Sequence, residues 1–534
     1  MQKQTTIYSA HERALFVFDV KGYSWRRWRR ELFTGIPPAL RPALTREVLL
    51  KFDPSQRTES LRFLAKQRDL CKEKTNWQLT ASEDKLRAYC TEHSNTCKKI
   101  SESNATPEEK YRKITELLHL HGLAPHDLKT EKNPEPAIKR AACQFWWRKR
   151  VRKAQGREIE KLAISWGAVS NRRALHCSNH TAQRRIEQRA RNAETLKNLT
   201  LISSKGDVIS MADVAEKSIS NPAIRRGELM TRIAGFEALA KENNYTPLFI
   251  TWTCPGRMHA QLSKSGEKNP NYDGTTPREA QAHLCKQWAR TRAAASRKKL
   301  DFYGIRVCEP HHDGCPHWHM LFFVHPDHQE AFQKLLKKYA LQVDSDEPGA
   351  QEVRCKTVKI DWKRGSAAGY IAKYISKNLD AYGLNTRATN AEAAGQAELW
   401  DTPRAKARRV DAWAACWGIR QFQQIGGPPV GIWRELRRIR EPLPSPAIEP
   451  YRAAADSGDW RAFCSLMQEK AGVQEGAPLT LARIWSDKPG RYDDPRGWRI
   501  EGIERGHVKI FTREKTWSIV PRGTSQPHEE KMLH

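Results

Sequence analysis

The segment that most constrains the fold is Cys308–Val324, which reads CEPHHDGCPHWHMLFFV. It ends in a dense apolar run, and Phe302–Pro310 alternates in a pattern that is typical of strands. An Asp-Gly pair at 313–314 is a turn signal between the two. We therefore predict a β-hairpin of Phe302–Pro310 and His317–Val324, with Glu309 on the first arm and two histidines on the second.

The spacing of these two histidines predicts a metal site. On a strand, residues i and i+2 point to the same face, so His317 and His319 would lie side by side with Trp318 turned away. A nearby carboxylate would complete a three-ligand site with open positions, where a phosphate oxygen could be polarised. Glu309 is our preferred third ligand. The alternatives are His311, His312 and Asp313, a structural zinc site that uses Cys315, or histidines that only satisfy hydrogen bonds in the core.

A second stretch, about fifty residues later, supplies a nucleophile. The segment SAAGYIAKYISKN predicts a helix over Ser366–Asn378 that is capped by its first serine. Tyr370 and Tyr374 are four residues apart and would share one face of this helix. Lys373 and Lys377 follow the two tyrosines by three residues each. A phenol titrates near pH 10, and an adjacent ammonium group would favour the phenolate. The alternative is ordinary aromatic packing on a helix.

The neighbouring segments predict the fold class. Thr246–Pro255 has the composition of a central strand, and Glu352–Asp361 reads as another. Thr276 and Glu279 form a capping box that starts a long basic helix, which should end near Arg297. Strands and helices in this order predict an α+β fold, with a central antiparallel sheet and helices on one face.

The net charge indicates the class of partner, and the cysteine pattern indicates the redox compartment. The 534 residues carry a formal net charge of +31, which favours nucleic acid as a partner. The 12 cysteines form no CxxC pair, so a zinc ribbon or a secreted disulfide framework is not expected. We see no signal peptide and no apolar run near the ~20 residues that a membrane span needs. The sequence therefore predicts a protein of the reducing cytosol.

The chain divides into three regions by composition. Residues 1–217 form a largely helical, basic region that could bind nucleic acid, with Arg, Lys and Trp clusters at Tyr23–Phe33 and Cys143–Ala154. Amphipathic helices with buried tryptophans are the alternative for these clusters. Residues 218–440 hold the motifs described above. Residues 441–534 comprise a Pro-rich linker, a short helical segment, a possible hairpin at Gly506–Val520 and a disordered tail.

Two histidines around an apolar residue on a strand, with tyrosine on a following helix, resemble the HUH nucleic-acid endonucleases. The sequence closely resembles the bacteriophage replication gene A protein family over about 218–440. The segments that carry this resemblance are FITWTCPGRMH, NPNYDGTTPREAQ, EPHHDGCPHWH, GYIAKYISKN and WGIRQFQQIGGPPV.

The resemblance implies a concrete activity. Such a protein nicks one strand at the phage origin by tyrosine attack on a phosphate held by Mg²⁺ or Mn²⁺. It keeps a 5′-phosphotyrosine, leaves a 3′-OH primer for rolling-circle replication, and rejoins the strand through its second tyrosine. A host helicase and a replicative polymerase are implied as partners, in the cytoplasm of the bacterial host. The alternatives are a plasmid-type HUH initiator, relaxase or transposase, and a non-enzymatic DNA-binding protein with a structural metal.

Overall fold

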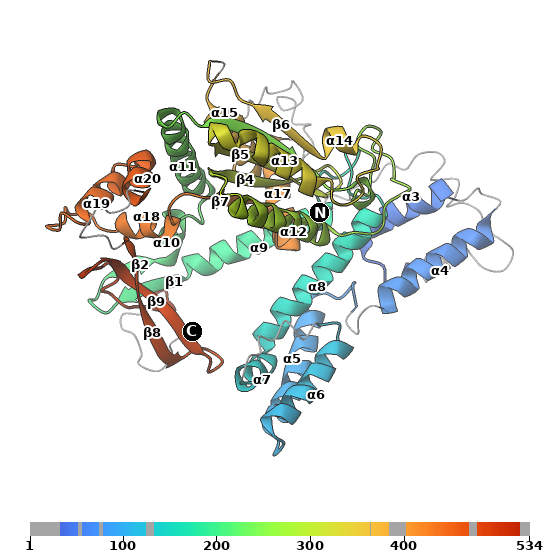
Figure 1. Cartoon of the computed structure of the whole chain (residues 1–534). Helices are drawn as coiled ribbons and strands as arrows, with labels where there is room; N and C mark the ends of the chain where they lie inside the picture. Colours follow the sequence, from blue (N-terminus) through green and yellow to red (C-terminus); the bar gives the residue numbers. More distant parts are fainter. Residues whose placement is uncertain are drawn as a thin grey trace, which may run out of the picture. The chain divides into compact units, whose positions relative to one another are not determined.

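The computed structural model describes residues 33–51, 56–73, 78–123, 133–363, 365–383, 402–468 and 478–523. Contacts divide the chain into two compact units (Figure 1). Unit 1 comprises Met1–Ala174, Ser178–His180 and Pro489–Asp494, and unit 2 comprises Leu175–Cys177, Thr181–Lys488 and Pro495–His534. The basic cluster that begins at Tyr23 and the C-terminal tail, which the sequence predicts to be disordered, fall outside the described residues, apart from Phe33 at the end of the cluster.

Unit 1 is mainly helical in its described residues. Its elements are η1 (Pro38–Leu40), α3 (Arg41–Lys51), α4 (Arg57–Glu73), α5 (Glu83–Ser101), α6 (Pro107–Leu120), α7 (Glu135–Ala141) and α8 (Gln144–Ser165). Helix α5 packs against α8, and α7 contacts both. Trp146 and Trp147 of α8 are 7% and 0% exposed. These tryptophans are core residues, which favours the amphipathic-helix interpretation of Cys143–Ala154.

Unit 2 is built on a five-stranded sheet in the order β6–β3–β5–β4–β7, in which all neighbours are antiparallel. The strands are β3 (Thr246–Trp252), β4 (Phe302–Pro310), β5 (Pro316–Val324), β6 (Cys355–Lys359) and β7 (Phe422–Ile425). The predicted hairpin is confirmed as β4 and β5, whose register runs from Phe302 opposite Val324 to Pro310 opposite Pro316. Strand β6 is shorter than predicted.

Helices cover both faces of this sheet. Phe249, Leu321 and Phe323 belong to the core under α11 (Pro222–Glu242) and α15 (Ala367–Leu379). On the other face Phe322 stacks on Trp288 of α12 (Pro277–Arg297), with ring centroids 5.5 Å apart. Helix α13 (Gln329–Ala340) packs beside α12. The expectation of helices on one face was therefore wrong, because every residue of β5 is buried and both its faces need a cover.

Unit 2 contains further helical elements. They are α9 (Asn179–Lys197), α10 (Met211–Glu216), η3 (Gly256–Met258), η4 (Pro326–His328), α14 (Ala350–Val353), α17 (Pro403–Trp417), α18 (Val430–Leu436), α19 (Glu449–Asp456) and α20 (Trp460–Gln468). Helix α17 packs on α15, and α20 packs on α11. None of the described helices combines the length and apolar character that crossing a membrane requires.

Two small three-stranded sheets complete unit 2. One has the order β11–β1–β2, with β1 (Leu199–Ser203), β2 (Val208–Ser210) and β11 (Trp517–Pro521). The other has the order β10–β9–β8, with β8 (Thr480–Pro489), β9 (Pro495–Arg505) and β10 (Val508–Phe511). The predicted hairpin at Gly506–Val520 was wrong, because β10 and β11 belong to different sheets.

Candidate active site

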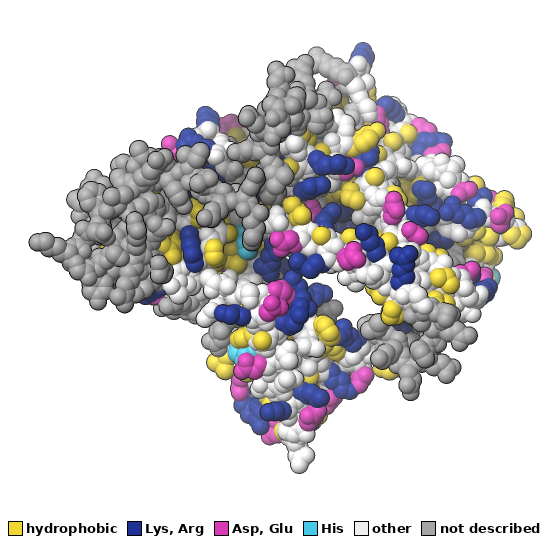
Figure 2. All heavy atoms as spheres, turned by 180° about the vertical axis from the view of Figure 1, so that it is seen from behind, with side chains coloured by type: hydrophobic (Ala, Val, Ile, Leu, Met, Phe, Trp, Pro, Cys, Tyr) yellow, Lys and Arg dark blue, Asp and Glu magenta, His cyan; other side chains and the backbone are white. Residues whose placement is uncertain are grey.

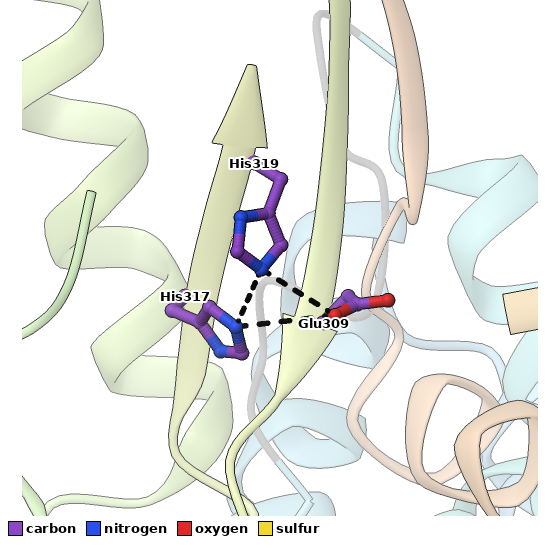
Figure 3. Close-up of side chains that lie close together, drawn as sticks. All are labelled: Glu309, His317 and His319. Atoms are coloured by element: carbon purple, nitrogen blue, oxygen red, sulfur yellow. Dashed lines mark hydrogen bonds and ion pairs between the residues drawn. The ribbon is translucent and has the colours of Figure 1, made fainter. Parts of the chain in front are cut away.

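The β4–β5 hairpin brings Glu309, His317 and His319 together (Figure 3). Glu309 lies directly opposite His317 in the register. The two histidine Nε2 atoms are 2.9 Å apart, and Glu309 Oε2 lies 3.9 Å from His317 Nε2 and 3.5 Å from His319 Nε2. In the part of the chain that the structure describes, these three side chains are the only such group of potential metal ligands.

The separations between the three ligand atoms fit a divalent ion. They define a point about 2.0 Å from all three atoms, the usual length of a bond from zinc or magnesium to nitrogen or oxygen. One carboxylate and two imidazoles leave coordination positions for other ligands. The donor set therefore suits an ion that also binds substrate.

Burial favours the protonation state that a metal needs. His317 and His319 are 9% and 7% exposed. Burial lowers the pKa of His317 well below its usual value, and the neighbouring His311 and His319 lower it further, so this imidazole is neutral at pH 7. A neutral imidazole is the form that binds metals. Thr251 Oγ1 lies 3.2 Å from His319 Nδ1, which leaves Nε2 facing the site.

The alternative ligands lie outside this group of three. Asp313 accepts a hydrogen bond from the Cys315 backbone at 3.0 Å and lies 3.2 Å from His259 Nδ1. The ring of His311 packs on His317 with centroids 4.0 Å apart, and burial lowers the pKa of His311 to about 3. Burial raises the pKa of the Cys315 thiol. Neither these residues nor His312 belongs to the group of three.

Helix α15 brings both tyrosines to the histidine face of the sheet. The ring of Tyr374 stacks on His319 with centroids 3.9 Å apart. Phe249 lies under both tyrosines, with its centroid 5.5 Å from Tyr374 and 6.2 Å from Tyr370. Tyr370 is 40% exposed, whereas Tyr374 is partly buried against the core. The two phenols therefore lie on the same face of the sheet, but Tyr370 is more exposed to solvent than Tyr374.

The two lysines both lie near Tyr374, and not one beside each tyrosine. Lys373 Nζ lies 4.9 Å and Lys377 Nζ lies 5.7 Å from the centroid of the Tyr374 ring. No such contact involves Tyr370 in the described ranges. Burial raises the pKa of Tyr374, and the charge of Glu309 raises it further. This phenol is therefore protonated at pH 7 despite its two ammonium neighbours.

Sequence reasoning missed two residues at the site. Asn378 near the end of α15 donates to Glu309 Oε1, and Gln421 donates to Asn378 Oδ1 at 3.1 Å. Both residues lie in segments that carry the family resemblance, GYIAKYISKN and WGIRQFQQIGGPPV, but the sequence alone did not assign either of them a role at the site. Their roles depend on bringing α15 and the segment before β7 against the end of β4, which periodicity does not encode.

Comparison with known proteins places the chain in a family. The profile described as bacteriophage replication gene A protein (GPA) matches residues 72–382. The chain is 39% identical over 398 residues to the replication gene A protein of Escherichia phage 186, covering 72% of this chain and 56% of that protein. It is 35% identical over 395 residues to a probable replication protein of Pseudoalteromonas phage PM2, covering 73% and 60%.

A bacterial relative carries a more specific name. A probable replication endonuclease from a prophage-like region of Salmonella paratyphi A is 33% identical over 407 residues, covering 72% of this chain and 49% of that protein. The matched segments thus span between about half and three fifths of these relatives. No solved structure matches. The profile covers more than half of the sequence, and the chain belongs to the bacteriophage replication gene A protein family.

Proposed function

We propose that this chain is a phage DNA replication initiator that nicks one strand of the origin by tyrosine attack on a metal-bound phosphate. The observation that carries the proposal is the stacking of Tyr374 on His319, which puts a phenol against a potential metal ligand. An ordinary packed helix has no need for two tyrosines beside a group of one carboxylate and two imidazoles. The relative that is named a replication endonuclease supports the same class of reaction.

Three side chains would hold the divalent ion, Mg²⁺ or Mn²⁺. They are Glu309, His317 and His319, and the ion would polarise a non-bridging oxygen of the scissile phosphate. The tyrosine oxygen forms a bond to phosphorus as the bond from phosphorus to the 3′-oxygen breaks. The phenol proton leaves and the 3′-oxygen gains a proton, so the products are a 5′-phosphotyrosine and a free 3′-OH. Attack by that 3′-OH reverses the step and rejoins the strand.

Lys373 and Lys377 would counter the negative charge of this reaction. Their ammonium groups lie over the Tyr374 ring. Glu309 opposes formation of the Tyr374 phenolate, and a bound cation would offset its charge. Two tyrosines next to one metal site suit two successive transfers, as rolling-circle initiation and termination require.

The charge of the chain supports DNA as the substrate. Lys356 on the edge strand β6 is exposed and lies opposite Thr251, so it shares the face that carries His319. Figure 2 shows Lys and Arg side chains spread over the described part of one side of the protein, with acidic groups between them. We propose that residues 218–440 form the endonuclease and that residues 1–217 help to engage origin DNA. In the same scheme, residues 441–534 form a small C-terminal region.

A covalent-adduct assay tests the proposal. The protein is incubated with Mn²⁺ and single-stranded origin DNA that is labelled at its 3′ end, because the 3′ fragment is the one that would stay on the tyrosine; the mixture is then denatured and run on a gel. A labelled band that resists denaturation and disappears in the Tyr370→Phe/Tyr374→Phe double variant is expected. Tight DNA binding without any adduct would contradict the proposal and favour a DNA-binding protein with a structural metal.

A further inference from the structure

We infer that Asn378 is a positioning residue that orients Glu309 as a metal ligand, an inference that rests on the proposed function. Glu309 divides its two oxygens between different partners. Oε2 faces the two histidines, whereas Oε1 accepts a hydrogen bond from Asn378 Nδ2 at 2.5 Å. A carboxylate held in this way cannot rotate both oxygens away from the histidines. Only one oxygen remains for the ion.

The orientation of the Asn378 amide is itself fixed. Gln421 Nε2 donates to Asn378 Oδ1 at 3.1 Å, so the carbonyl oxygen of Asn378 points toward Gln421 and the amide nitrogen points toward Glu309. The backbone carbonyl of Gln421 accepts from Cys308 N at 2.7 Å. The residue next to Glu309 thus holds Gln421 in place. Asn378 is 2% exposed, so water does not compete for these bonds.

Asn378 also ties the ligand to the helix that carries the tyrosines. Its Nδ2 donates to Tyr374 O at 2.6 Å in the last turn of α15. One amide group therefore contacts both the carboxylate and the backbone of a proposed nucleophile. Hydrogen-bond partners of metal ligands commonly contribute 10- to 100-fold to affinity, because they hold the ligand in its binding orientation. We assign Asn378 this role, and Gln421 a supporting one.

The isosteric change Asn378→Asp tests the inference in the full chain. It keeps the acceptor for Gln421 but replaces the donor to Glu309 with a carboxylate oxygen. We expect the dissociation constant for Mn²⁺, measured by calorimetry, to rise about 10- to 100-fold. Gln421→Leu frees the Asn378 amide to turn, and a rise of about 3- to 10-fold is expected. Nicking by both variants should recover when Mn²⁺ is raised to saturation, which a misfolded site would not do.

Asn243→Asp is the matched control. Asn243 caps the end of α11 and donates to Leu239 O four residues back at 2.9 Å, as Asn378 does to Tyr374 O, but it does not contact Glu309. Its Mn²⁺ affinity should stay within about twofold of wild type. This control separates a metal effect from a helix-end effect.

The possible failures are distinguishable. One result is that wild type binds Mn²⁺ and His319→Ala does not, while Asn378→Asp and Gln421→Leu bind Mn²⁺ as tightly as wild type. The positioning role of Asn378 is then wrong, and the proposed metal site stands. If wild type and His319→Ala both bind no Mn²⁺, the proposed metal mechanism fails together with that role.

Discussion

At the scale of single residues, His319 is the most sensitive ligand to test. It makes the shortest contact to Glu309 Oε2 within the group and also supports the ring of Tyr374. We predict that His319→Ala lowers the nicking rate by at least about 100-fold, because it removes a ligand from the ion that polarises the phosphate. Origin-DNA affinity should stay within a few-fold of wild type, because phosphate contacts elsewhere carry most of it. Filter binding and nicking assays measure the two quantities separately.

His312→Ala is the control for this variant. His312 lies on the same hairpin but outside the group of three ligands. The His312→Ala variant should nick at close to the wild-type rate. EDTA should abolish nicking by this variant and by wild type, because both retain the three ligands. Full nicking by EDTA-treated wild type would rule out a metal-dependent step.

The paired tyrosines give a second prediction at this scale. Tyr→Phe removes the nucleophilic oxygen and leaves the ring, so the stacking of residue 374 on His319 should survive. We predict that the double Phe variant forms no covalent adduct. Each single variant should retain some first-step cleavage where the other tyrosine substitutes for it, and neither should release a closed circle. Adduct formation and strand joining are measured separately; wild-type cutting and circularisation in one single variant would make its tyrosine a packing residue.

Side-chain alternation along a strand predicts the three metal ligands of this site, but it does not predict where the two lysines lie. The H-x-H spacing and the hairpin turn are local, so they predicted that Glu309, His317 and His319 converge. The pairing of one lysine with each tyrosine was a local expectation too, and it differs from the structure. Both ammonium groups lie over Tyr374 because of the side-chain rotamers that the lysines adopt, which helical spacing alone does not fix.

At the scale of elements, the attachment of α15 to α11 should control the tyrosines. The Glu237 carboxylate accepts from Ser366 Oγ at 2.7 Å and from Ala368 N at 2.8 Å, so it caps the first turn of α15 from a neighbouring helix. We predict that Glu237→Gln costs about 1 kcal/mol of stability. It should also slow adduct formation, because the helix that carries both tyrosines is less firmly held. Chemical denaturation and the adduct assay measure the two effects.

The same contact has a pH signature. Burial alone would raise the pKa of Glu237, but hydrogen bonds from Ala368 N, Lys241 and Ser366 outweigh it and leave the pKa below its usual value. The stabilisation is therefore present above the pKa of the unfolded chain, about 4.3, and is lost as pH falls through the folded value. Glu237→Gln should lose less stability on acidification than wild type. Glu242→Gln is the control, since Glu242 forms a surface ion pair with Arg461 and such pairs contribute about 0–1 kcal/mol.

Local sequence signals predicted some elements far better than others. Helix α12 runs over Pro277–Arg297 with the Thr276–Glu279 capping box in place, as the sequence predicted. That signal is contained in four consecutive residues. Strands β10 and β11 were read as one hairpin, yet β11 pairs with β1, more than 300 residues away in sequence. A strand whose partner is this distant carries no local sign of which sheet it joins.

At the scale of the whole molecule, fragments should separate cleavage from DNA engagement. A break at Ser218 would remove β1, the central strand of the sheet β11–β1–β2, and would expose β11. It would also remove Arg185 and Arg189, which pair with Asp411 at 2.7 Å and 2.9 Å. We therefore predict that a fragment of residues 218–534 is less stable than one of residues 175–534. Thermal unfolding of the two fragments tests this, and equal stability would mean that β1 contributes little to unit 2.

The fragment of residues 175–534 then tests what the N-terminal region adds. It retains Glu309, His317, His319 and both tyrosines, so we predict that it cleaves single-stranded origin DNA at close to the rate of the full chain. It lacks the basic helices of unit 1, and each lost phosphate contact reduces the slope of log K against log[salt] by about 0.9 on duplex DNA. Duplex origin DNA should therefore bind more weakly and with a shallower salt dependence. Titrations from low to physiological salt measure both quantities; identical affinity and slope in the fragment and the full chain would make unit 1 a scaffold, in line with the burial of Trp146 and Trp147.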